Sequence, residues 1–226
     1  MKIKNLTLSF WNKVVLKNIN TEIKPWEFVF VIGKSGSWKT SFIRTIIWDF
    51  KPTNWEIILD DNNSLYYKKN DKFISNYRKK IWVVFQDYKL LESKTVYENV
   101  AFWMEVCWYS NSEIKHRVPN ILKQVWLLLK KDKYVYEISG WEKQRVSIAR
   151  ALVNQPDIII WDEPTGNLDP ETSDKIIDLF EDLNKLWKTI ILATHDKNLV
   201  NKYKKRVITF SEKEIISDLN PWTYNL

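Results

Sequence analysis

The stretch from Val31 to Ser41, "VIGKSGSWKTS", comes close to the phosphate-binding pattern G-x-x-x-x-G-K-[ST]. Gly33 opens this pattern, and Lys39 and Thr40 close it, but tryptophan stands where the second glycine belongs. In such a loop, backbone N–H groups at a helix N-terminus bind phosphate oxygens, the lysine reaches the β- and γ-phosphates, and the hydroxyl binds Mg²⁺. The alternative is a serine-rich turn that matches by chance. The candidate nucleotide-binding residues of the loop are Gly33, Lys34, Ser35, Gly36, Ser37, Trp38, Lys39, Thr40 and Ser41, the last of them available to the α-phosphate.

An acidic pair follows an apolar run in "DIIIWDEP", residues 157–164. The four apolar residues predict a buried strand that presents Asp162 and Glu163 at its carboxyl end. There Asp162 can hold Mg²⁺, and Glu163 can polarise an attacking water molecule. An acidic pair at a strand end can also be an ordinary turn, so this segment alone does not decide the function.

Strands and helices alternate along the chain, and both motifs lie at strand ends. The pattern predicts strands at 2–10, 14–23, 27–32, 56–60, 81–87, 157–163 and 189–196, a final short β segment, helices at 40–47, 139–155 and 173–186, and a helical piece at 75–80. The part from Tyr88 to about Tyr136 is mainly helical, with Pro119 at a bend or a helix start. This order is typical of an α/β fold with a mainly parallel sheet and a helical insertion.

Composition narrows the class of protein. The chain has 226 residues and a formal charge of +7. The N-terminus lacks the apolar core of a secretion signal, and no run approaches the ~18 apolar residues that span a bilayer. Cys107 is the only cysteine, which predicts a reducing compartment. Basic clusters, among them Lys130–Lys133 and Lys202–Arg206, are either solvated faces or surfaces that attract nucleic acid or anionic lipid.

The segment "ISGWEKQRVSIARAL", which begins at Ile138, resembles the signature L-S-G-G-[EQ]-x-Q-R of the ABC ATPases. Trp141 replaces the second glycine of that signature. Other family elements follow in order: Gln86 in "VVFQD" resembles the Q-loop, Asp169 in "GNLDP" the D-loop, His195 in "ATHD" the switch histidine, and Phe10 the aromatic residue that stacks on adenine. The ordered set covers essentially the whole chain, so it is far more specific than any lone match.

This resemblance implies a P-loop NTPase fold, in which one ABC nucleotide-binding domain spans residues 1–226. That domain would have an N-terminal antiparallel β portion and a helical subdomain at about 87–138. Two copies would enclose two ATP molecules with Mg²⁺, each phosphate loop facing the signature of the other copy. The resemblance assigns catalysis to Lys39, Glu163 and His195, the metal to Thr40, Gln86 and Asp162, and the signature in trans to Ser139, Gly140, Trp141 and Glu142.

Within the family, "WVVFQDYKLLESKTVYENVAF" and "DEPTGNLDP" are most similar to the cell-division ATPases known as FtsE. That similarity implies an FtsX-like transmembrane partner, an ATP-dependent homodimer, a peripheral place on the cytoplasmic face of the membrane, and no specific nucleic acid. One alternative is the ATPase of a lipoprotein-release or macrolide exporter. Others are an inactive scaffold with the ATPase fold and a DNA-associated ATPase, which a steep salt-dependent affinity for DNA would support.

Glycine and tryptophan have unusual frequencies. The chain has 4 glycines, far below the usual ~7%, and 13 tryptophans, and the two counts together would be an ordinary glycine content. We hypothesise that these tryptophans are UGA codons that the source organism decodes as glycine, whereas a pseudo-ATPase with genuine indoles is the alternative. Trp26 and Trp55 are predicted at turns, Trp48 and Trp187 at helix ends, Trp11 in a tight connection, and Trp82, Trp103, Trp108, Trp126 and Trp161 where relatives carry small residues, while Trp222 is uninformative.

Overall fold

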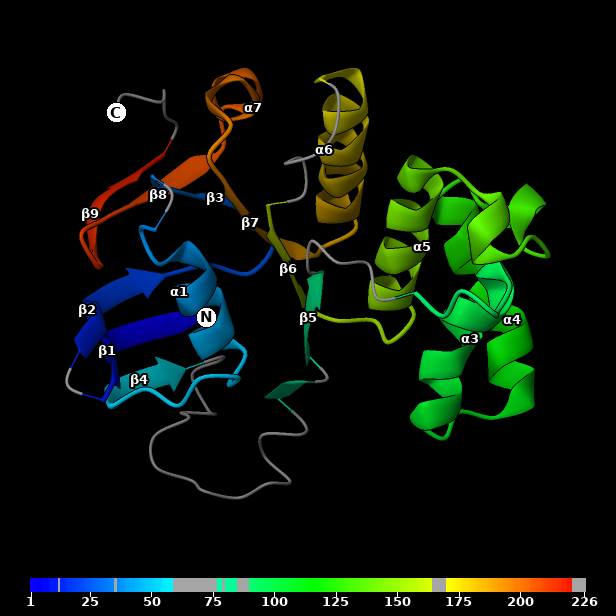
Figure 1. The fold of residues 1–226 in the computed structure, drawn as a ribbon, viewed down its shortest axis with the longest axis horizontal. Coiled ribbons are helices and arrows are strands. Elements are labelled where there is room, and N and C mark those ends of the chain that lie inside the picture. Colours follow the sequence, from blue (N-terminus) through cyan, green and yellow to red (C-terminus); the bar gives the residue numbers. More distant parts are fainter. Residues whose placement is uncertain are drawn as a thin grey trace. The chain divides into compact units, whose positions relative to one another are not determined.

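The computed structural model describes residues 1–11, 13–34, 36–58, 77–78, 80–84, 90–163 and 170–220. The chain forms two compact units. The first joins Met1–Val83 to Asp157–Leu226, and the second runs from Val84 to Pro156 (Figure 1). Among the described residues, no helix combines the length and the apolar content that crossing a bilayer requires.

A three-stranded sheet opens the first unit, in the order β2-β1-β4. Its strands are β1 (Lys2–Phe10), β2 (Lys13–Glu22) and β4 (Asn54–Ile58), and β1 pairs with both neighbours in antiparallel fashion. This sheet confirms the predicted antiparallel β portion near the N-terminus. The turn predicted at Trp55 is wrong, because this residue lies within β4.

A six-stranded sheet forms the centre of the first unit, in the order β5-β6-β7-β3-β8-β9. Strand β3 is parallel to β7 and β8, β6 is parallel to β7, and β9 is antiparallel to β8. Every residue of β3, β6 and β7 is buried, as expected of parallel strands covered on both faces. The strands are β3 (Phe28–Ile32), β5 (Ile81–Val84), β6 (Ile158–Asp162), β7 (Thr189–Thr194), β8 (Arg206–Ser211) and β9 (Glu214–Leu219).

Among the described residues, α1, α6 and α7 are helices of the first unit that accompany these sheets. Helix α1 (Lys39–Ile46) contacts β2 of the small sheet and β6 of the large one, and α6 (Pro170–Lys185) packs against β7 (Figure 1). Helix α7 (Lys197–Tyr203) was not predicted from the sequence. It begins after β7, where the Asp196 side chain accepts hydrogen bonds from the backbone N–H groups of Asn198 and Leu199.

The second unit is helical. It contains α3 (Val96–Val106), α4 (Asn111–Gln124), α5 (Gly140–Leu152) and the 3₁₀ turns η1 (Leu128–Lys130) and η2 (Val135–Glu137). Pro119 lies inside α4, so this residue is not at a helix start. The carbonyl that loses its N–H partner belongs to Lys115 (four residues earlier), which is exposed to water.

Capping boxes begin all three of these α-helices. At the start of α3, the Thr95 hydroxyl accepts from the Glu98 N–H at 3.1 Å, and the Glu98 carboxylate accepts from the Thr95 N–H at 2.8 Å. The backbone and hydroxyl bonds from Thr95 lower the pKa of Glu98. Ser110 and Ser139 cap α4 and α5 in the same way, with Glu113 and Glu142 as their partners.

We expect Thr95→Ala to lower the free energy of unfolding by about 1 kcal/mol at neutral pH, because one N–H at the start of α3 loses its acceptor. The folded-state pKa of Glu98 lies below its unfolded value, so its contribution is present above the ordinary glutamate pKa and is lost as pH falls through the folded value. The difference between variant and parent should therefore narrow in acid. Urea titrations from pH 3 to pH 7 measure it, with Thr95→Ser as the control. A pH-independent difference would contradict the linkage.

Candidate phosphate-binding and hydrolytic site

Three neighbouring parallel strands of the first unit end at the same edge of the sheet. Ile32 at the end of β3 is level with Thr194 of β7, and Asp162 at the end of β6 is level with Ala193. The phosphate loop, the acidic pair and His195 all follow these strand ends. The topology thus brings together segments far apart in the sequence, at the edge where α/β sheets bind ligands (Figure 1).

Lys39, the first residue of α1, turns back over the loop that precedes it. Its ammonium group donates to the Gly33 carbonyl at 2.7 Å and to the Lys34 carbonyl at 3.5 Å. The side chain is only 8% exposed. The loop therefore holds a buried positive charge beside a helix N-terminus, which is the arrangement that binds phosphate.

Gly33 has no room for a side chain. A Cβ there would lie 2.4 Å from the Ser37 hydroxyl oxygen and 2.5 Å from the Phe210 carbonyl oxygen, at a φ of +157°. The loop thus passes directly against β8, which fixes where it turns into α1.

Gly33→Ala is expected to lower the free energy of unfolding by about 1–3 kcal/mol, because the backbone must move away from β8. Thermal unfolding of the two proteins measures the loss. Gly140→Ala is the matched control for stability, since a Cβ at Gly140 meets nothing within 4 Å. Equal stability of all three proteins would show that the loop adapts without strain.

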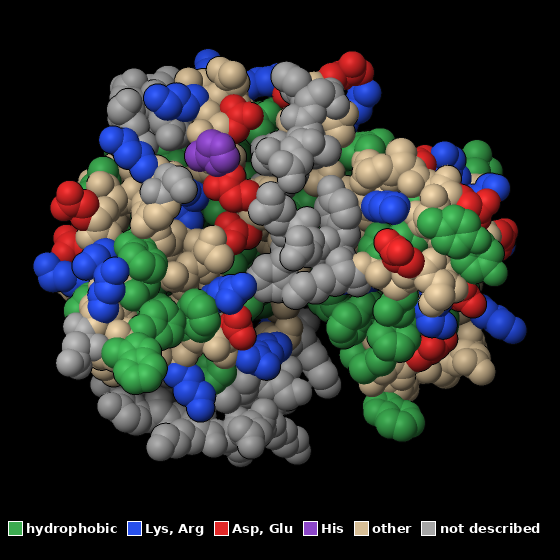
Figure 2. All heavy atoms as spheres, viewed as in Figure 1, with side chains coloured by type: hydrophobic (Ala, Val, Ile, Leu, Met, Phe, Trp, Pro, Cys, Tyr) green, Lys and Arg blue, Asp and Glu red, His purple; other side chains and the backbone are tan. Residues whose placement is uncertain are grey.

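Glu163 connects the loop to the switch histidine. One carboxylate oxygen, Oε1, lies 3.6 Å from the Lys39 ammonium, and the other, Oε2, lies 2.8 Å from His195 Nδ1. Figure 2 shows acidic side chains gathered beside a histidine on this face. The structure therefore brings together the three residues to which the sequence assigned catalysis.

The backbone at Glu163 is left-handed, with φ 53°. Its N–H donates to the Ala193 carbonyl at 3.0 Å, which ties the end of β6 to β7. Left-handed geometry is costly for a residue with a side chain, and such strain concentrates at functional sites. The strained turn points the carboxylate of Glu163 towards Lys39 and His195.

Asp162, the last residue of β6, is buried. Burial raises the pKa of its carboxyl group, and the charge of Glu163 acts in the same direction, whereas a bond from the Thr40 hydroxyl and the charge of Lys39 oppose the rise. Its Oδ1 atom has no hydrogen-bond partner among the described residues. A buried carboxylate oxygen without a partner, next to a hydroxyl, is a donor set that fits Mg²⁺. Within the described residues, no cluster of three His, Cys, Asp or Glu side chains surrounds a metal position.

Phe10 ends β1 and is 38% exposed, with its ring edge-on to Phe50 at 5.0 Å between centroids. Lys13, its partner across the strand pair, places its ammonium 5.8 Å from the centre of the Trp38 ring. The predicted adenine-binding residue therefore lies at the end of a hairpin that reaches the phosphate loop. Sequence reasoning did not single out Lys13. Three predicted site residues, Ser35, Gln86 and Asp169, lie outside the described residues.

The signature residues lie in the second unit. Ser139 and Gly140 are exposed at the start of α5, and Glu142 forms the capping box there. Glu142 also pairs with Lys130 at 2.5 Å, a contact that sequence reasoning missed because the two residues are distant along the chain. Hydrogen bonds from Lys130 and Ser139 outweigh partial burial and lower the pKa of Glu142. The Arg145 guanidinium lies 4.9 Å from the centre of the Trp141 ring.

Comparison of the sequence with known protein families leads to the same class of protein as the motifs and the site. Residues 16–166 match the family described as ABC transporter. The chain belongs to this family. The prediction of an ABC-type ATPase, made from the signature and its accompanying motifs, is confirmed.

Relatives of two kinds match the ABC chain over nearly its whole length. The cell division ATP-binding protein FtsE of Bacillus subtilis is 44% identical over 219 residues, with 96% of this chain and 95% of the relative covered. FtsE of Mycobacterium tuberculosis is 41% identical, with 93% and 91% covered. The methionine import ATP-binding protein MetN of Carboxydothermus hydrogenoformans is 38% identical, with 97% of this chain but 68% of the relative covered.

Solved ABC structures share the fold. CbiO1 of Clostridium perfringens, described as part of the transporter complex cbiONQ, has a TM-score of 0.90 at 33% identity, with 97% and 88% of the two chains covered. The ATP-binding cassette MJ0796, in a dimeric post-hydrolysis state bound to ADP and phosphate, has a TM-score of 0.82 at 33% identity, with 99% of both chains covered.

Proposed function

We propose that this protein is the ATP-binding and hydrolysing subunit of an FtsEX-like membrane complex that acts in cell division. The proposal of ATP hydrolysis rests on the carboxylate of Glu163, which lies between Lys39 and His195 at the sheet edge. The cell-division part is supported by 44% identity to a cell division ATP-binding protein across 95% of that relative.

Binding of ATP would begin at the phosphate loop. The N–H groups at the start of α1 would face the phosphate oxygens, and the Lys39 ammonium would exchange its carbonyl partners for the β- and γ-phosphates. Phe10, exposed at the end of β1, would stack on the adenine ring. Thr40, Asp162 and Gln86 would hold Mg²⁺, which when bound neutralises charge on the phosphates.

Hydrolysis would use the residues that follow β6 and β7. Glu163 would accept a hydrogen bond from the attacking water and so orient it towards the γ-phosphorus. A bond forms between the water oxygen and phosphorus while the bond to the bridging oxygen of ADP breaks, and ADP and inorganic phosphate leave. His195 would hold Glu163 in place through the 2.8 Å contact and donate to the γ-phosphate.

A homodimer would complete each site. Ser139, Gly140, residue 141 and Glu142 of one copy would face the γ-phosphate bound by the loop of the other, and Asp169 would lie at the dimer contact. The exposed start of α5 and the dimeric state of the solved cassette MJ0796 support this arrangement.

The partner would be an FtsX-like transmembrane protein, and the ATPase would sit peripherally on the cytoplasmic face of the membrane. The competing assignments are an exporter of lipoproteins or macrolides and, from the MetN relatives, an importer. An inactive scaffold and a DNA-associated ATPase remain the alternatives from other classes.

Two measurements in the cells of origin test the assignment. The chain, tagged and purified from detergent-solubilised membranes, should bring down an FtsX-like membrane protein, and its depletion should block cell separation. Co-purification of an exporter or importer permease, with normal division on depletion, would replace the cell-division assignment. Binding to DNA that falls steeply with salt would instead favour the DNA-associated class.

A further inference from the structure

Tryptophan dominates the left-handed positions of this backbone. Only a few per cent of non-glycine residues have positive φ, and asparagine, aspartate and histidine are the residue types enriched there. Among the described residues, half of the non-glycine residues at positive φ are tryptophans. Their φ values are 56° at Trp11, 64° at Trp26, 70° at Trp38, 66° at Trp48, 62° at Trp108, 54° at Trp126 and 61° at Trp187.

Four of the seven tryptophans lie directly after the C-terminal end of a helix. Trp48 follows the C-cap of α1, its N–H donates to the Thr45 carbonyl at 3.0 Å, and the next N–H, from Asp49, donates to the Arg44 carbonyl at 2.8 Å. These two bonds define a Schellman motif, whose left-handed residue is usually glycine. The same pair of hydrogen bonds occurs at Trp108 after α3 and at Trp126 after α4. Trp187 follows α6 in the same way, and its N–H donates a hydrogen bond to the Asn184 carbonyl.

The other three tryptophans occupy turns. Pro25 and Trp26 are the central residues of a turn that the Glu27 N–H closes on the Lys24 carbonyl at 3.4 Å. Proline followed by a residue at φ 64° is the type II pattern, which requires glycine or asparagine at the second position. Trp11 follows β1 at the hairpin to β2, and Trp38 is the left-handed residue just before α1. Each of the seven backbone positions thus favours glycine for its own local reason.

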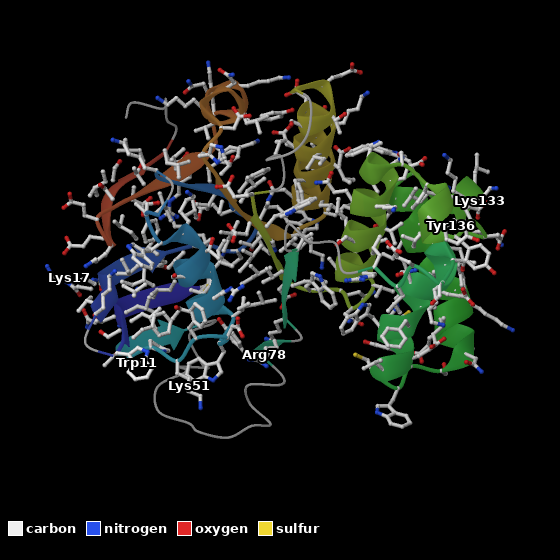
Figure 3. The ribbon with its side chains drawn as sticks, viewed as in Figure 1. Trp11, Lys17, Lys51, Arg78, Lys133 and Tyr136 are labelled. Carbon is white, nitrogen blue, oxygen red and sulfur yellow. The ribbon has the colours of Figure 1, made fainter. Side chains whose placement is uncertain are left out.

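Packing does not account for the exposed indoles of this set. Trp11 and Trp108 are 100% and 95% exposed, and Trp11 is labelled at the end of its hairpin in Figure 3. Trp26 and Trp187 lie mostly in solvent with their rings against each other. Trp161, which is at ordinary φ, is buried, but its indole N–H has no hydrogen-bond partner among the described residues. Buried tryptophan normally finds such a partner.

We infer that the functional polypeptide carries glycine at positions 11, 26, 38, 48, 108, 126 and 187, and that the codon written as tryptophan is decoded as glycine in the cells of origin. A single reassigned codon accounts for the tryptophans at the helix ends, in the turns and in the phosphate loop. The same reassignment would place glycine at position 141 in the signature. The inference rests on backbone geometry and does not depend on the proposed cell-division role.

The stability of a variant at one helix end tests whether the left-handed backbone there favours glycine. Trp108→Gly should raise the folding equilibrium constant about fivefold, because relief of the left-handed strain exceeds the entropy cost of glycine. Cys107→Gly is the matched control, since Cys107 is also exposed but sits at φ −88°. It should lower stability. A loss of stability in both variants would overturn the inference that this geometry requires glycine.

Peptide mass spectrometry of the protein purified from its own cells tests the inference directly. Trypsin would release residues 35–44 with one missed cleavage, residues 124–130 and residues 134–143, which report on positions 38, 126 and 141. Glycine at all three positions is the expected result. Tryptophan at any of them would overturn the inference, and the ATPase assignment would then rest on the chain as written.

Discussion

Glu163→Gln is expected to lower ATP turnover by about 10²–10⁴-fold while ATP binding is kept, with an affinity equal to or higher than that of the parent. The amide keeps the size and position of the carboxylate, so the site remains intact. It cannot accept a proton from the attacking water, and it removes the negative charge that faces both Lys39 and His195. With hydrolysis blocked, we also expect ATP to hold the variant as a dimer.

Steady-state phosphate release, nucleotide binding and size-exclusion chromatography with ATP measure these effects, in a chain with glycine at positions 38 and 141. Glu171→Gln provides the control, because Glu171 is exposed on α6 and pairs only with Lys175 among its described contacts. Turnover within a few-fold of the parent for Glu163→Gln would show that another group orients the water.

Trp38→Gly should raise the affinity for ATP on the order of a hundredfold, the value of one or two hydrogen bonds to a charged group. Residue 38 sits at φ 70° and ψ 20° directly before α1, where phosphate must approach the backbone N–H groups. Its indole packs against the core and faces Lys13, whereas glycine would leave no side chain beside these N–H groups.

Titration with a fluorescent ATP analogue measures the affinity of both chains. Trp187→Gly is the matched control, because it also removes an indole from a left-handed position but at the end of α6, away from the loop. It should raise stability without changing the affinity for ATP. Equal affinities of the parent and Trp38→Gly would mean that the loop accommodates the indole.

Much of the site followed from the sequence because its residues are tied to strand ends. The buried runs that became β3, β6 and β7 were recognisable as strands, and parallel strands necessarily bring their carboxyl ends to one edge. The convergence of Lys39 and Glu163 was therefore predictable, and the resemblance to the ABC ATPases added His195. The cap at Ser139 was also recognisable, from the glutamate three residues later.

Other features depend on tertiary context that local patterns do not contain. Helix α7 has only seven residues, too few for a reliable period. Pro119 lies inside α4, where the residue four positions earlier, Lys115, is exposed. Trp55 was predicted at a turn, but pairing with β1 makes this segment a strand. The left-handed backbone of Glu163 could not be predicted, because glutamate is not a residue type that favours positive φ.

Under the proposed function, the position of Glu163 would also set the order of nucleotide binding and hydrolysis at the site. Its carboxylate is the counter-ion of the Lys39 ammonium, and that ammonium is the group that a γ-phosphate needs. Under the proposed mechanism, the nucleotide and the carboxylate would compete for one positive charge. The carboxylate would become free to accept a hydrogen bond from water only after the γ-phosphate had replaced it at Lys39, so nucleotide binding would itself activate the base.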